Sequence, residues 1–83
     1  MKGLKQTSRD LIAWVSVTNP DTSFHTLDVP EHLRKSLSGL VIKDFLTSVR
    51  DESEYRTYRI TDSGLSYATR YAADEQAAFR GIA

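Results

Sequence analysis

The sequence contains no cysteine, which excludes disulfide bonds, cysteine metal sites and a thiol nucleophile. It also has no apolar run that approaches the ~20 residues needed to span a bilayer. Its first ten residues, MKGLKQTSRD, contain no apolar stretch of the signal-peptide type. We therefore expect a cytoplasmic protein that has no contact with a membrane.

An excess of charge of either sign is also absent. The chain carries 11 basic and 11 acidic residues, so its formal net charge is zero. This balance argues against a protein that coats nucleic acid through bulk charge. The basic residues are nevertheless clustered, because residues 29–50 hold four of them against two acidic residues. An acidic stretch at residues 51–54, DESE, interrupts this cluster before Arg56 and Arg59.

The remaining composition is ordinary for a small globular domain. Hydrophobic residues make up 40% of the 83 residues and charged residues 27%. A chain of this length has room for one hydrophobic core. We predict a single domain over residues 1–83.

Helical periodicity predicts three helices, over about residues 4–17, 29–43 and 62–79. The middle helix repeats leucine at positions 33, 37 and 40, and its opposite face carries Glu31, Lys35, Ser38 and Ile42. The expected N-caps are Thr7 or Ser8, Asp28, and Thr61. The stretch DTSFHTLDV, residues 21–29, is compatible with a short strand, an irregular loop or a single helical turn.

A β-hairpin is expected over about residues 45–60. The segments FLTSVR and YRTYRI are rich in β-branched and aromatic residues, and the polar DESE between them is typical of a hairpin tip. Tyr58 and Ile60 share one face of the second strand, because successive strand side chains alternate. We expect that face, and Trp14 of the first helix, to belong to the core.

This ordered set resembles the winged helix-turn-helix domain of small bacterial and phage transcription regulators. In that family a leucine-spaced recognition helix leads through a tight corner into a hairpin wing, and a threonine caps the next helix. The corner here is Lys43-Asp44-Phe45-Leu46, with Asp44 where the family usually has glycine, because the chain adopts a positive φ there. The matching residues after the wing are Tyr58, Ile60, Thr61 and Gly64.

The resemblance implies an α+β fold of three helices with a two- or three-stranded wing. The second helix of the motif is either one turn or absent, since few residues separate the first helix from the third. The family binds duplex DNA with the recognition helix, here 29–43, and the wing, here 45–60. The implied DNA-binding residues are His32, Arg34, Lys35, Ser38, Lys43, Arg50, Arg56 and Arg59.

Alternatives to DNA binding stay open. The same basic residues can form an ordinary solvated helix face. The zero net charge and the acidic tip favour a winged-helix module that binds protein and not DNA. Tyr67 and Tyr71, one turn apart, form either an interface for a homodimer through the last helix or a satellite of the core. No metal, cofactor or catalytic motif is recognisable, so we do not expect an enzyme.

Overall fold

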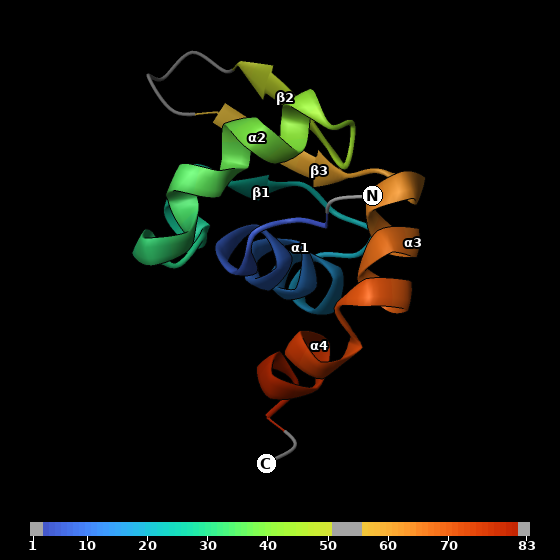
Figure 1. The fold of residues 1–83 in the computed structure, drawn as a ribbon. Coiled ribbons are helices and arrows are strands. Elements are labelled where there is room, and N and C mark those ends of the chain that lie inside the picture. The colour runs from blue at the N-terminus through green and yellow to red at the C-terminus, as the bar shows by residue number, and fades with distance from the viewer. Residues whose placement is uncertain (1–2, 51–55, 82–83) are drawn as a thin grey trace.

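The computed structural model describes residues 3–50 and 56–81 of the chain, and within them the fold is α+β. Four α-helices, two short 3₁₀ helices (η) and three strands follow one another along the sequence (Figure 1). The helices are α1 Gln6–Thr18, η1 Thr26–Asp28, η2 Glu31–Ser36, α2 Leu37–Ile42, α3 Asp62–Tyr71 and α4 Ala73–Phe79. The strands are β1 Phe24–His25, β2 Leu46–Arg50 and β3 Arg56–Ile60.

The three strands form one antiparallel sheet in the order β1-β3-β2. The antiparallel pairing of β2 with β3 confirms the two strands of the hairpin expected over residues 45–60, and the sheet has three strands. Leu46 pairs with Ile60, and Phe24 pairs with Tyr58. All four of these side chains are buried, because the alternation of strand side chains turns them toward the helices.

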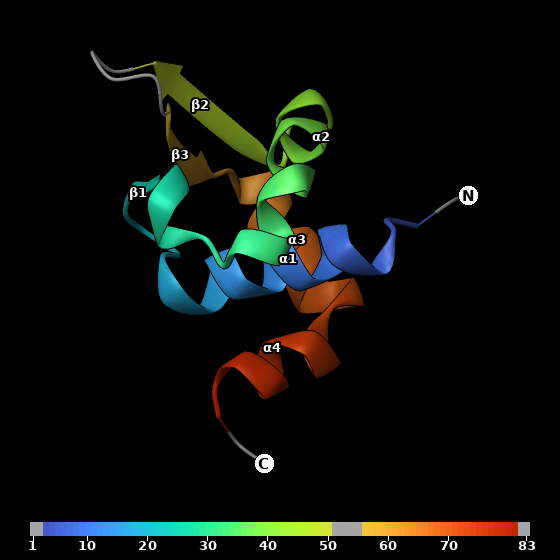
Figure 2. The same ribbon diagram turned by 90° about the vertical axis from the view of Figure 1, so that its left-hand side faces the viewer.

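Helix α1 lies at the centre of the molecule, with the sheet and α2 on one side and α4 on the other (Figures 1 and 2). It packs against η2, α2, α3 and α4. Leu33, Leu37 and Leu40 are at most 4% exposed, as their spacing predicts, and they meet α1 residues that include Leu11. Each fully buried leucine contributes roughly 1.5–3 kcal/mol through removal of apolar surface from water.

The aromatic side chains behave largely as expected. Tyr58 is buried, and its ring stacks on Phe24 at a centroid distance of 5.7 Å. Trp14 packs edge-on against the same Phe24, also at 5.7 Å, but is only partly buried. These three rings link α1 to the centre of the sheet.

The first helix begins differently from the prediction. Its N-cap is Lys5, which provides no side-chain hydrogen bond. Thr7 and Ser8 lie inside the first turn, so the expectation that one of them caps the helix is wrong. The N-cap residue of α1 consequently provides no side-chain acceptor for the free N–H groups of the first turn.

The ambiguous segment before η2 combines two of the expected conformations. Phe24 and His25 form β1, and the next three residues form the single turn η1. The His25 ring accepts a hydrogen bond from the Leu27 N–H at 3.1 Å, and Asp28 accepts one from the His25 N–H at 2.9 Å. This reciprocal cap closes one turn of helix.

The continuous α-helix expected over residues 29–43 is wrong in its first half. Residues 31–36 wind as the 3₁₀ helix η2, and only Leu37–Ile42 are α-helical. A 3₁₀ helix has three residues per turn, so Leu33 and Ser36 lie on the same side. Both are buried against α1, which favours the tighter winding.

The single helix expected over residues 62–79 is also wrong, because it breaks at Ala72, where φ is −130° and ψ is 29°. The break redirects α4 across α1 (Figure 1). There the Gln76 amide donates a buried hydrogen bond of 2.9 Å to the Ser16 hydroxyl. Packing of α4 on α1 thus replaces one long helix with two short ones.

Candidate nucleic-acid interface

The corner between α2 and β2 sets the position of the candidate interface. The Phe45 N–H bonds the Leu40 carbonyl at 3.0 Å, and the Asp44 N–H bonds the Val41 carbonyl at 3.0 Å. This pair of bonds is the Schellman arrangement of a helix C-terminus. Asp44 has a φ of 68°, the left-handed conformation predicted for that position. The chain therefore turns directly from α2 into the wing, and the two elements lie side by side.

One face of η2 and α2 is turned to solvent, as the leucine spacing predicts. Glu31, Lys35 and Ser38 are exposed, and Ile42 is 84% exposed. This surface forms a ridge, defined by Lys35, Ser38 and Ile42. A shallow groove runs along each side of it.

The wing-side groove, of about 300 Å³, lies between α2 and the hairpin. Its α2 wall is Ser38, Val41 and Ile42, and its sheet wall includes Ser48 and Arg56. Arg56 is exposed and lies on the same sheet face as Tyr58, two positions along, so its guanidinium is presented toward α2. Its Nη1 lies 3.5 Å from the Ser48 hydroxyl, which accepts a weak hydrogen bond.

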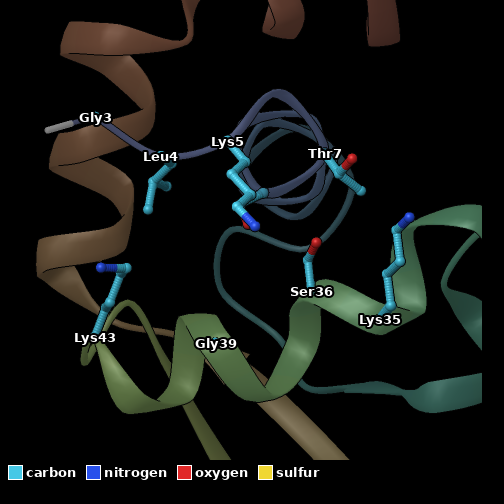
Figure 3. Close-up of a pocket in the computed structure, with 9 residues that line it drawn as sticks. Gly3, Leu4, Lys5, Thr7, Lys35, Ser36, Gly39 and Lys43 are labelled. Atoms are coloured by element: carbon cyan, nitrogen blue, oxygen red, sulfur yellow. The ribbon is translucent and has the colours of Figure 1, made fainter.

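The second groove, of about 540 Å³, lies between α2 and the start of α1, and we call it the N-terminal groove (Figure 3). Gly39 forms part of its α2 wall, and a Cβ added there would meet no atom within 4 Å. Three lysines and three hydroxyl residues line it: Lys5, Lys35, Lys43, Thr7, Ser8 and Ser36. No carboxylate is among the described residues that line either groove.

Arg34 does not join this surface. Its Nε donates to the Val29 carbonyl at 3.0 Å, and its Nη2 lies 3.5 Å from the Leu27 carbonyl. The half-buried guanidinium therefore holds η2 against the loop that precedes it. The prediction that Arg34 reads bases conflicts with this geometry, because a guanidinium engaged by main-chain carbonyls is not presented to a ligand.

The other predicted DNA-binding residues are dispersed. His32 is exposed on η2 but lines neither groove. Arg59 lies three positions after Arg56 and so faces the opposite side of the sheet, beside Thr47, its pairing partner. Arg50 ends β2 opposite Arg56. The acidic tip, residues 51–54, lies outside the described residues. Lys35, Ser38, Lys43 and Arg56 are thus the predicted residues that come together along α2.

Tyr67 and Tyr71 do not form an exposed pair. Tyr67 is 9% exposed, its ring packs on Phe45 at 4.9 Å, and its hydroxyl accepts from the Leu4 N–H at 3.2 Å. Its assignment as an interface residue is wrong, because the N-terminal segment crosses over that side of α3. Tyr71 is 57% exposed and packs on Tyr67 at 5.0 Å.

Sequence reasoning missed the contribution of the N-terminal segment. Lys5 and Thr7 are about thirty residues from Lys35 and Ser36 in the chain, and no local pattern connects them. They meet because α1 packs against η2 and α2. The helical spacing of the leucines identifies the buried side of η2 and α2 but not the element that covers it.

Neither a metal site nor a membrane-spanning helix is present among the described residues. No three His, Asp or Glu side chains there come close enough together to hold a metal ion. None of the helices in residues 3–50 and 56–81 combines the length and apolar character that crossing a bilayer requires.

Comparison of the chain with known proteins gives no match to a family model, a curated protein or a solved structure.

Proposed function

We propose that this chain is a winged-helix protein that binds duplex DNA through α2 and the wing, in transcriptional control. The observation that carries the proposal is the charge of the two grooves beside α2. Four cationic side chains gather there, Lys5, Lys35, Lys43 and Arg56, and no described lining residue is acidic. In a chain of zero net charge this segregation provides a local basic face for phosphates.

The order of elements supports the winged-helix interpretation. A helix, a short strand, a helical segment, a hairpin and a final helix follow one another, and Thr61 caps α3 as the resemblance implies. The corner at Asp44 has the positive φ that the family's glycine provides. This arrangement brings the ridge and the wing to one side of the molecule, where both can reach a duplex.

The ridge offers the chemistry for contact with base edges. Lys35 can donate to guanine acceptors, the Ser38 hydroxyl to either kind of edge, and Ile42 can contact a thymine methyl group. The α-helical part has six residues, which span about 9 Å at 1.5 Å per residue. That length covers about three base pairs at 3.4 Å each. We therefore expect base recognition to be limited and phosphate contacts to dominate affinity.

Arg56 and Arg59 provide a matched pair for testing the proposal. Both are exposed arginines of β3, but only Arg56 faces α2. Fluorescence anisotropy with a labelled duplex should show binding at low salt that weakens as salt rises. Arg56→Ala should lower affinity evenly across sequences and reduce the salt slope by about one, whereas Arg59→Ala should change neither.

Two results would contradict the proposal. One is the absence of duplex association at low salt, a condition that strengthens exposed electrostatic attraction. The other is equal loss of affinity in Arg56→Ala and Arg59→Ala, which would place the duplex elsewhere.

A second candidate function, protein binding, is favoured by the 84% exposure of Ile42 beside the wing-side groove. It predicts negligible salt dependence and loss of partner capture in Ile42→Ser.

A further inference from the structure

The N-terminal groove contains a serine hydroxyl that has no hydrogen-bond partner among the described residues. Ser36 is 9% exposed and precedes the first residue of α2. Its side chain does not cap α2 and forms no hydrogen bond with any residue in the described part of the chain. Figure 3 shows this hydroxyl pointing from the α2 side toward α1, across the groove. Because the hydroxyl faces the open groove, it is free to donate to a ligand there.

The charges along the groove indicate the kind of ligand that could bind this hydroxyl. Lys5 lies on the segment ahead of α1, and Lys35 and Lys43 lie toward the two ends of the opposite wall, with Ser36 between them (Figure 3). None of the three lysines forms an ion pair with a described residue. Three ammonium groups without an ion pair to a described residue and one hydroxyl donor line a groove that has no described carboxylate, and such a lining suits an anion with several acceptor oxygens.

The start of α1 adds a further attraction for an anion. This helix has 13 residues, and its N-cap Lys5 provides no side-chain acceptor for the free N–H groups of the first turn. Thr7 and Ser8, in that turn, line the groove. A helix N-terminus carries partial positive charge, which reinforces the field of the lysines.

We propose that the N-terminal groove seats a phosphate of the DNA backbone, so that the segment ahead of α1 is a third DNA-contacting element beside α2 and the wing. This inference rests on the proposed function. Lys5 and Lys43 hold the phosphate from opposite walls, and the Ser36 hydroxyl donates to one of its oxygens. Lys35 lies between this groove and the ridge. The contact fixes the register of α2 on the duplex without reading sequence.

The test compares salt dependence in charge-neutral variants. In anisotropy titrations at four salt concentrations, Lys5→Gln and Lys43→Gln should each weaken duplex binding and lower the salt slope by about one. Sequence preference should stay the same, because phosphates carry none. Arg80→Gln is the control, since Arg80 is exposed at the end of α4, across α1 from α2 (Figure 1).

Ser36→Ala separates binding from folding. Removing a hydroxyl that faces the groove and bonds no described residue should leave the free energy of unfolding nearly unchanged. The same change should weaken duplex binding about fivefold to tenfold, because a hydrogen bond to a charged group is lost. Gly39→Glu is a second probe, since the added side chain has open space and places a carboxylate in the groove. It should lower affinity more than either lysine change.

The results distinguish the two proposals. Duplex binding with unchanged slope in Lys5→Gln and Lys43→Gln would overturn the phosphate site and leave the proposed function standing. No duplex binding by the unaltered chain would overturn both. Titration with inorganic phosphate, followed by amide shifts at Thr7, Ser36 and Gly39, tests a free anion as the ligand. Saturable amide shifts at these residues, combined with no duplex binding, would show that the ligand of the groove is a small phosphate and not the DNA backbone.

Discussion

The hydroxyl of Thr61 donates a hydrogen bond of 2.7 Å to the main-chain carbonyl of Asp44. The same hydroxyl accepts from the Gly64 N–H at 3.0 Å and so caps α3. The Thr61 N–H also bonds the Phe45 carbonyl at 3.0 Å. One residue therefore joins the corner after α2 to the exit from the wing. These bonds fix the angle between α2 and the β2–β3 hairpin, the two elements that we propose to contact DNA.

Thr61→Val should destabilise the protein by about 1–2 kcal/mol. The change keeps the shape of the side chain but removes both hydroxyl bonds, and loss of an N-cap alone typically costs about 1 kcal/mol. Thr61→Ser keeps the hydroxyl and should retain most of the stability. Urea unfolding monitored by Trp14 fluorescence measures both. Equal midpoints for Thr61→Val and the unaltered chain would show that the hydroxyl bonds contribute nothing.

Gly64→Ala should be strongly destabilising, by more than about 2 kcal/mol. A Cβ at Gly64 would collide with the Phe45 carbonyl oxygen and lie 2.7 Å from Cγ1 of Ile60. Gly39→Ala is the matched control, because nothing lies within 4 Å of its Cβ and alanine favours a helix interior. It should stabilise by about 0.5–1 kcal/mol. Thermal unfolding that ranks the two variants in the opposite order would contradict this packing.

Arg34→Ala should lower the free energy of unfolding. Its guanidinium donates to the Val29 carbonyl and approaches that of Leu27, and a hydrogen bond from a charged donor contributes about 1.5–3 kcal/mol before solvent screening. We expect a loss of about 1 kcal/mol for this half-buried group. Lys35→Ala, at the adjacent exposed position, should change stability by less than about 0.5 kcal/mol. The reverse pattern in denaturant titrations would show that the hydrogen bonds of the Arg34 guanidinium contribute nothing to stability.

The ionisation of Glu75 makes the free energy of unfolding depend on pH in the acid range. The hydrogen bond from the Gln6 amide, 2.8 Å long, lowers the pKa of Glu75, with a smaller effect from Arg9 and against the opposing effect of burial. A carboxyl with a lowered pKa stabilises the fold above its ordinary pKa, and this contribution disappears as pH falls through the lowered value. Glu75→Gln should flatten the acid side of the stability curve.

Features that depend on near neighbours in the chain could be predicted from the sequence. The spacing of Leu33, Leu37 and Leu40 identified one buried face, and strand alternation placed Tyr58 in the core. Thr61 was recognisable as a helix cap, and Asp44 as a residue that tolerates positive φ. These signals are reliable because the backbone geometry that causes them extends over only a few residues.

Contacts between distant segments were decided only by the tertiary structure. Arg34 is withdrawn from the surface by carbonyls of the preceding loop, and Tyr67 is buried because the N-terminal segment crosses α3. The helix break at Ala72 comes from packing of α4 on α1, which outweighs the helical hydrogen bonds lost at the break. Lys5 and Lys43 line one groove for the same reason: burial of apolar faces brings segments together by shape, and no periodicity along the chain records which segments meet.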